Sequence, residues 1–277
     1  MSRPEHSAPP EIFYNETEAK KYTCNSRMIE IQSRMSERAV ELLNLPEEEE
    51  CLVLDIGCGS GLSGSVLTEH GHVWIGLDIS AAMLEVASNR EVEGDLLLAD
   101  MGCRLPFRAG SFDGAISVSA LQWLCNADKS YHNPRKRLTT FFQSLFACLT
   151  RGARAIFQLY PETPQQMELI TNTAMRCGFH GGLVVDYPNS TKAKKFFLCL
   201  FAGTDFNTPV ELPRGLEDEG QADQVTNIER RRLRAKGVKV QKKSRDWILK
   251  KKERQRKQGK AVRQNTKYTG RKRPRFV

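Results

Sequence analysis

The chain has 277 residues, 40% of them hydrophobic, which is enough to bury one core of ordinary domain size and leave extensions. No apolar run approaches the ~20 residues that span a bilayer, and residues 1–10 lack the apolar stretch of a secretory signal. We therefore expect neither a membrane protein nor a secreted one. The eight cysteines and five histidines are scattered without the spacing of zinc ligands, so we expect reduced thiols and no metal site.

Basic residues are concentrated at the carboxyl end of the chain. Residues 221–277 hold 22 of the 42 lysines and arginines but only four of the 33 acids, so this part carries +18 and residues 1–220 carry −9. Such a tail is expected to bind the phosphates of RNA. The alternatives are a solvated end without a partner, or a nuclear-import signal at Lys250–Arg254 or Arg271–Arg275. We expect RNA docking combined with import, and hence a nuclear location with some protein in the cytoplasm.

Apolar periodicity predicts a helix followed by alternating strands and helices. Apolar residues recur every three or four positions from Ser26 to about Leu45, which is typical of an amphipathic helix. Short apolar runs then predict strands at Cys51–Ile56, Val73–Leu77, Leu96–Ala99, Gly114–Val118, Ala153–Leu159, Leu183–Tyr187 and Phe196–Phe201. Helices are expected at Ser63–Glu69, Ala81–Asn89, Arg135–Cys148 and Pro164–Cys177. This alternation is typical of a doubly wound α/β sheet, and Pro188–Ser190 predicts that the last two strands form an antiparallel hairpin.

These elements divide the chain into four segments. Residues 1–48 form an N-terminal helical segment, 49–203 the α/β domain, 204–227 an acidic linker and 228–277 the basic tail. In the first segment Tyr14, Tyr22 and Arg27 are candidates for a lid over the site, and a plain packing helix is the alternative.

A glycine-rich loop directly follows the first predicted strand. The segment Asp55–Gly61, with the sequence DIGCGSG, joins that strand to a helix, and its glycines allow the backbone to turn sharply and approach a ligand. Gly59, Gly61 and Gly64 also satisfy GxGxxG, the dinucleotide fingerprint, which alone is weak evidence.

Acidic residues at three consecutive strand ends distinguish between the ligands of such a loop. Asp55 would repel a pyrophosphate and attract a cationic amino-acid group. Asp78 ends the second strand, where it can accept both hydroxyls of a ribose. Asp100 follows the third strand, where it can accept a hydrogen bond from an adenine amino group while Met101 packs on the ring. Together they predict a nucleoside with a cationic aminoacyl end, whereas helix capping is the alternative for any single one.

With this loop and these acids the chain resembles the class I S-adenosylmethionine-dependent methyltransferases. The resemblance implies a Rossmann-like sheet, mostly parallel with a C-terminal antiparallel hairpin strand, and S-adenosylmethionine as cofactor. The residues then expected to bind the cofactor are Asp55, Gly57, Gly59, Gly61, Asp78, Ile79, Asp100, Met101 and Ser117.

Several further segments resemble a narrower family, the eukaryotic guanine-N7 methyltransferases of 18S ribosomal RNA. They are Asn25–Met28, Ser111–Leu124, Tyr160–Glu162, Val185–Ser190, Lys243–Arg254 and Tyr268–Arg273, so the resemblance spans nearly the whole chain. It implies a role in small-subunit biogenesis and a heterodimer with a small zinc-binding activator. Because the third strand, Leu96–Leu98, is expected at the sheet edge, we expect the activator to add a strand there.

The sequence lacks the motifs for other methylation chemistries, and this absence agrees with guanine N7 as the target. N7 has a free lone pair and no proton to remove, so no general base is expected. The fourth strand end has neither an Asn-Pro-Pro-Tyr-type motif for amine methylation nor a cysteine for the covalent route to pyrimidine C5. The target base must be unpaired or flipped out, and Trp123, Gln122 and Tyr160 are expected to receive and position it. Core packing is an equal alternative for Trp123.

Two other functions stay open at this point. One is a ribosome-assembly factor whose scaffold role is independent of catalysis, and the other is a methyltransferase for another substrate.

Overall fold

The computed structural model describes residues 3–46, 49–190, 193–203, 212–216 and 252. The chain separates at residue 217 into two units, and every element named below belongs to the first, Met1–Glu217. Most of the expected linker and nearly all of the basic tail lie outside the described residues. In the described part, no helix combines the length and apolar character that crossing a bilayer requires, and no group of His, Cys, Asp and Glu is arranged to hold a metal.

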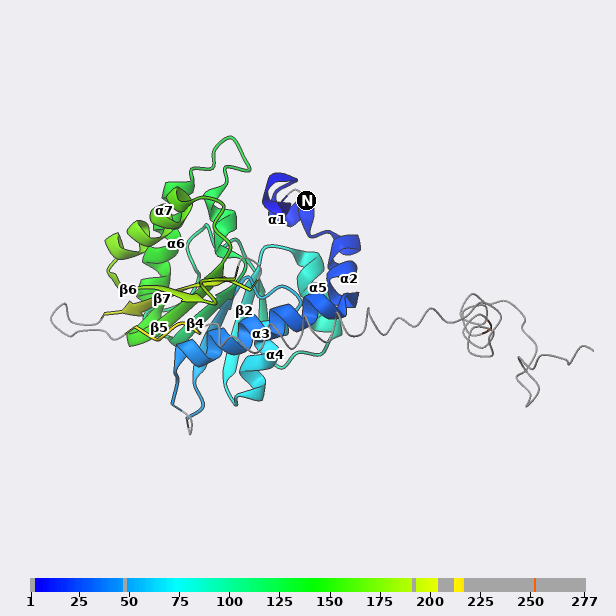
Figure 1. Ribbon diagram of the computed structural model, residues 1–277, viewed down its shortest axis with the longest axis horizontal. Coiled ribbons are helices and arrows are strands. Elements are labelled where there is room, and N and C mark those ends of the chain that lie inside the picture. The colour runs from blue at the N-terminus through cyan, green and yellow to red at the C-terminus, as the bar shows by residue number, and fades with distance from the viewer. Residues whose placement is uncertain (1–2, 47–48, 191–192, 204–211, 217–251, 253–277) are drawn as a thin grey trace, which may run out of the picture. The chain divides into compact units, whose positions relative to one another are not determined.

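A seven-stranded sheet forms the centre of this unit, in the order β3-β2-β1-β4-β5-β7-β6 (Figure 1). Its strands are β1 Leu52–Ile56, β2 Val73–Asp78, β3 Asp95–Leu98, β4 Phe112–Val118, β5 Leu149–Leu159, β6 Phe179–Asp186 and β7 Lys195–Ala202. Strands β1 to β5 pair in parallel, and β7 runs antiparallel to both β5 and β6. This confirms the expected parallel sheet with a C-terminal hairpin, and β3 lies at one edge as expected.

Helices cover both faces of the sheet, as the alternation predicts. The helices are α3 Ser26–Leu43, α4 Leu62–Glu69, α5 Ala81–Asn89, α6 Pro134–Cys148 and α7 Pro164–Arg176. One core cluster joins α3 and α4 to the sheet, and a second joins α6 and α7 to its other face. Side-chain caps fix where three of these helices begin: Ser80 accepts from Met83 N at 3.2 Å, Asn133 from Lys136 N at 3.1 Å and Thr163 from Gln166 N at 3.2 Å.

Short helices that apolar periodicity does not reveal precede and interrupt this pattern. They are η1 Pro4–His6, α1 Pro10–Phe13, α2 Glu16–Cys24 and η2 Leu121–Cys125. Residues 3–14, which contain η1 and α1, are called the N-terminal strap below. Figure 1 shows α2 beside α5.

Two strands begin four residues earlier than their apolar runs predict. In β6 the extra residues include Gly181 and Gly182, which pair with β7. Gly181 has φ +139°, and a Cβ there would lie 2.0 Å from the carbonyl oxygen of Cys199. Glycine therefore allows close backbone approach inside this strand, where sequence rules would predict an interruption.

Gly64, the last glycine of the GxGxxG pattern, is a packing position. It lies in α4 against the indole of Trp74 in β2, and a Cβ on Gly64 would be 2.1 Å from Trp74 Cζ2. Trp74 is only 1% exposed, and its Nε1 donates to Thr68 Oγ1 at 3.0 Å. The buried and hydrogen-bonded indole cannot move aside, so this glycine holds α4 close to the sheet.

Gly64→Ala should therefore lower the free energy of unfolding by about 1–3 kcal/mol through overpacking, even though alanine is the better helix former. Denaturant unfolding monitored by circular dichroism measures the change. The double variant Gly64→Ala/Trp74→Leu should lose less stability than the two single changes add up to. Simple additivity of the two changes would contradict the packing explanation.

Candidate functional site

A hollow of about 940 Å³, partly open to solvent, lies at the carboxyl ends of β1, β2, β3 and β4. Ligands of open α/β sheets bind at this edge, where the strand order reverses. The predicted site residues that line it are Gly57, Gly59, Asp78, Ile79, Asp100, Met101 and Trp123. Gly61 does not line it and is the residue before α4, with φ +78°. Asp55, Ser117, Gln122 and Tyr160 do not line it either, and their positions are described below.

The glycine loop is held close to the strand beside it. The amides of Gly57 and Cys58 both donate to the Leu77 carbonyl oxygen, at 2.8 and 3.1 Å. Gly57 has φ +74°, and a Cβ there would lie 2.4 Å from the Cβ of Ala120. A side chain at this position would thus be strained by the backbone and would collide with the opposite wall.

Asp78 connects the loop to the start of α5. Its Oδ2 accepts from Gly59 N at 2.9 Å, and its Oδ1 accepts from Ser80 N at 2.8 Å. Burial raises the pKa of Asp78, while these backbone hydrogen bonds act to lower it. Asp78 lines the hollow, and because a carboxylate oxygen can accept more than one hydrogen bond, its side chain can also accept from ribose hydroxyls.

Asp55 lies beneath the loop rather than in the wall of the hollow. Its side chain is fully buried, and its Oδ2 accepts from Ser63 Oγ at 2.6 Å. Burial raises the pKa of Asp55 to about 7, with a smaller contribution from the charge of Asp78. A positive group bound in the hollow would favour the ionised form of the Asp55 carboxylate by electrostatic attraction across the loop. The sequence instead suggests a direct contact between Asp55 and such a group.

Asp100 lies in the wall next to an arginine that no sequence motif reveals. Arg137 Nη2 donates to Asp100 Oδ1 at 2.6 Å and to Oδ2 at 2.8 Å, and the Gly102 amide donates to Oδ1 at 2.8 Å. Arg137 comes from α6 and also lines the hollow. The ion pair fixes the position of the Asp100 carboxylate relative to Met101 beside it.

The N-terminal strap supplies the opposite wall. Pro10 and Tyr14 line the hollow, and the Tyr14 carbonyl oxygen accepts from Ser80 Oγ at 2.7 Å. The rings of Phe13 and Tyr14 lie 6.2 and 5.9 Å from the ring of Trp123. Trp123 is 5% exposed, so it is both a packed residue and part of the wall.

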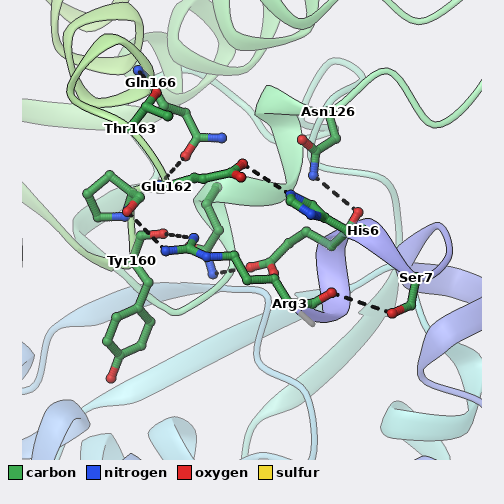
Figure 2. A network of polar contacts seen from close by, with 11 residues as sticks. Arg3, His6, Ser7, Asn126, Tyr160, Glu162, Thr163 and Gln166 are labelled. Atoms are coloured by element: carbon green, nitrogen blue, oxygen red, sulfur yellow. Dashed lines mark hydrogen bonds and ion pairs between the residues drawn. The ribbon is translucent and has the colours of Figure 1, made fainter. Parts of the chain in front are cut away.

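Three predicted residues lie one layer away from the hollow. Ser117 is buried within β4, while Val118, Ser119 and Ala120 after it reach the wall. The hydroxyl of Tyr160 is 3.2 Å from Met35 Sδ, and its carbonyl oxygen accepts from Arg3 at 2.9 Å (Figure 2). Gln122 is 4% exposed and contacts the strap.

One buried polar atom without a partner belongs to the wall of the hollow. In the described part of the chain the unpaired buried side-chain atoms are Asp55 Oδ1, Ser60 Oγ, Ser117 Oγ, Gln122 Oε1, His132 Nδ1 and Gln158 Nε2, and of these residues Ser60 lines the hollow. Most buried polar groups in folded proteins are hydrogen-bonded. The unpaired Ser60 hydroxyl is therefore a group that a polar ligand or a water in the hollow can satisfy.

The pKa of Asp55 gives this region a testable dependence on pH. Because the folded protein keeps a proton that the unfolded chain releases above a pH of about 4, the contribution of Asp55 to stability should be lost as the pH rises toward 7. Asp55→Asn should lack this loss. The denaturant concentration at the midpoint of unfolding, measured at pH values of about 4.5 and about 7.5, should therefore fall more between these pH values for the natural chain than for the variant. An equal fall in both proteins would contradict the raised pKa of Asp55.

Comparison with known proteins identifies relatives over the whole chain. Residues 54–157 match a family described as "Methyltransferase domain", and residues 200–275 match one described as "Methyltransferase involved in Williams-Beuren syndrome". The 18S rRNA (guanine-N(7))-methyltransferase of Mus musculus is 59% identical over 279 residues, which cover 99% of this chain and 98% of the relative. The 18S rRNA (guanine(1575)-N(7))-methyltransferase of Saccharomyces cerevisiae is 50% identical over 282 residues, with coverage of 99% and 98%.

A solved structure agrees with the fold. The S-adenosylmethionine-dependent methyltransferase from Aquifex aeolicus superposes with a TM-score of 0.50 at 14% identity, over 68% of this chain and 98% of that one. At this identity the likeness concerns the fold alone, whereas the relatives above match from end to end. The chain belongs to the 18S rRNA (guanine-N(7))-methyltransferase family.

Proposed function

We propose that this protein transfers the methyl group of S-adenosylmethionine to N7 of a guanine in 18S ribosomal RNA during small-subunit biogenesis. The observation that carries the proposal is the hollow at the strand ends, in which a glycine loop and the carboxylates of Asp78 and Asp100 face the aromatic wall of Trp123 and Tyr14. The side with the glycine loop and the carboxylates suits the nucleoside part of the cofactor, and the aromatic side suits the flat target base.

The described residues fit the cofactor. The glycine loop leaves space for close backbone approach, Asp78 keeps lone pairs for the ribose, and Ser60 has an unpaired hydroxyl in the wall. Asp100 and Met101 lie where the adenine would be held. When bound, S-adenosylmethionine supplies a methyl group on a positively charged sulfur.

The protein's part in the reaction is to hold and orient the base. Guanine N7 has no proton to lose, so its methylation needs no general base, and the Asp100 carboxylate in the wall is engaged by Arg137. Cys58 lines the hollow, but burial raises the pKa of its thiol well above the usual value, which makes it a poor nucleophile. The site therefore favours direct transfer over a covalent enzyme intermediate.

The N-terminal strap is our proposed lid. Phe13 and Tyr14 pack on Trp123, and Tyr14 is tied to Ser80 at the start of α5, which supports a cover that opens for RNA. Arg27, at the start of α3, is exposed. The side chain of Tyr22 lies outside the described residues.

A small zinc-binding activator is our proposed partner, with β3 as its docking strand. β3 is an edge of the sheet, and Leu98 within it is 59% exposed. An edge strand with an exposed leucine has unpaired backbone groups beside apolar surface, which supports strand addition by a second protein.

For segments that lie mostly outside the described residues, we further propose an acidic linker at 204–227 and a basic tail at 228–277. The +18 charge after residue 220 supports contact with ribosomal RNA and import into the nucleus.

Modification of ribosomal RNA tests the main proposal. Cells with the natural chain should yield 18S RNA that is cleaved at one guanosine after borohydride and aniline treatment. Asp78→Asn should reduce cleavage at least about tenfold through weakened ribose binding, and the corresponding change at an exposed site in α4 outside the hollow, Glu69→Gln, should not. Absence of cleavage that depends on this protein would refute the proposal. Normal subunit maturation with Asp78→Asn would show that the assembly role is independent of catalysis.

Edge-strand docking makes a second prediction. Leu98→Glu should weaken binding of the co-expressed activator by roughly 10- to 30-fold, as loss of an apolar anchor does. Leu183→Glu, a partly exposed leucine on the opposite edge strand β6, is the control and should leave affinity unchanged. Affinity can be measured by calorimetry. A natural chain that is monodisperse and active without any activator would contradict the proposed heterodimer.

A further inference from the structure

A short positive segment leads from η2 into α6. Residues 129–137, with the sequence KSYHNPRKR, contain four lysines and arginines and no acid, whereas residues 1–220 together carry −9. Two of the four cations are already paired with acids at the site. Lys129 lies 3.1 Å from Glu11 of the N-terminal strap, and Arg137 lies 2.6 Å from Asp100.

The other two cations, Arg135 and Lys136, are exposed and take part in no ion pair within the part of the chain that the structure describes. They lie in the first turn of α6, which contains no acid. The dipole of a helix favours anions at its start and disfavours cations. These two charges therefore oppose the stability of α6, and residues that break a local rule in this way are commonly functional.

An exposed aromatic ring precedes these cations. Tyr131 is 77% exposed, more than any other large hydrophobic side chain in the described chain. Its ring meets the ring of His132 edge to face, with 4.9 Å between the centroids. Four residues of fully extended chain span at most about 15 Å. The ring and the cations at Arg135 and Lys136 are therefore close enough to contact one short strand of RNA.

The segment borders the hollow without lining it at these three residues. Leu124, before the segment, lines the hollow, and so does Arg137 at its end. Between them, Lys129 contacts Glu11 of the strap, which supplies the opposite wall. A helix that follows a parallel strand begins at the carboxyl edge of the sheet, and the hollow lies at this same edge. Nucleotides on either side of a base in the hollow would therefore pass over this segment.

The composition of this surface matches single-stranded RNA. Proteins that bind single strands combine positive charge along the backbone with aromatic side chains on which bases stack. A guanine that enters the hollow must be unpaired or flipped out, so its neighbours in the strand are partly unstacked as well. Each such neighbour has a flat face that needs a stacking partner and a phosphate that needs a cation.

We infer that Tyr131, Arg135 and Lys136, called the border surface here, bind the nucleotides next to the target guanine. One base stacks on Tyr131, and Arg135 and Lys136 hold the neighbouring phosphates. This rests on the proposed N7 methylation. It gives the catalytic domain an RNA contact of its own, in addition to the basic tail, and this contact fixes the direction in which the strand passes the hollow. Because every base has a face that can stack, the surface selects unpaired RNA rather than one sequence.

Removal of one base from the RNA and of the ring from the protein tests the stacking contact. The probe is a fragment of 18S RNA that contains the guanosine located by borohydride and aniline mapping, with an abasic nucleotide placed in turn on either side of it. One abasic fragment should bind the full-length protein with its activator about 5- to 150-fold more weakly than the intact fragment, the range for one stacked base. Tyr131→Ala should lose similar affinity for the intact fragment and little more for the abasic one. Fluorescence anisotropy measures these affinities, and Tyr131→Phe, which keeps the ring, should restore them.

The salt dependence of binding tests the phosphate contacts. Each phosphate of a single strand that a cation neutralises adds about 0.7 to the slope of log affinity against log salt concentration. Arg135→Ala and Lys136→Ala should each reduce this slope by about that amount, whereas Tyr131→Ala should leave it unchanged. The matched control is Arg90→Ala, at an exposed arginine that ends α5 and so lies at the opposite edge of the sheet. It should leave the slope unchanged.

Two further measurements separate lost contact from lost structure. Arg135→Ala and Lys136→Ala remove positive charge from the start of a helix, so neither should lower the free energy of unfolding. Calorimetry should show the same affinity for S-adenosylmethionine in Tyr131→Ala as in the natural chain.

Three outcomes would overturn the inference. The natural chain and Tyr131→Ala could lose equal affinity with each abasic fragment, the two charge variants could keep the natural slope, or the variants could weaken binding of the activator instead of RNA, which would make the border surface a protein-docking site. Failure of the natural protein to methylate any guanosine of 18S RNA would instead refute the proposed function.

Discussion

The hydrogen bonds that hold the glycine loop against β2 are the constraint on which the site depends. Gly57 and Cys58 donate to the Leu77 carbonyl oxygen, and Gly59 donates to the carboxylate of Asp78. The loop thereby leaves β1 at a fixed angle, which opens the hollow above it and closes Asp55 beneath it. The same carboxylate orders the start of α5 through Ser80, and Ser80 in turn holds the strap at Tyr14.

The site is thus assembled from two halves with different physical character. The sheet half is made of backbone amides, carboxylates and buried polar atoms, which suit a polar cofactor bound in one orientation. The strap half is made of rings and a few polar anchors on Trp123, Tyr160 and Glu162. Few of its contacts are deeply buried, which supports the proposal that the strap is a lid that opens for RNA.

Much of the fold follows from local pattern, whereas the site does so only in part. The helix Ala81–Asn89 is predicted to the residue because Ser80 caps it and its periodicity is regular. The strand-end rule places Asp78, Asp100 and Trp123 around one hollow, and the structure has all three in its lining. The rule does not predict the direction in which a side chain points. The side chains of Asp55 and Ser117 are buried in the interior and do not line the hollow. Arg137 and the strap contacts depend on pairs 37 to 158 positions apart, for which no local signal exists.

The long sequence separation between the strap and its anchors affects how the protein is made. Arg3 is synthesised 157 residues before Tyr160. At ribosomal speeds of about 5–20 residues per second, the first helix waits roughly 10–30 s for the strand end that will hold it. Strands β1 to β4, whose carboxyl ends line the hollow, are synthesised within that interval, but the strap contacts at Tyr160 and Glu162 cannot form before it ends. Newly made protein should therefore acquire the sheet side of the hollow before it acquires the docked strap.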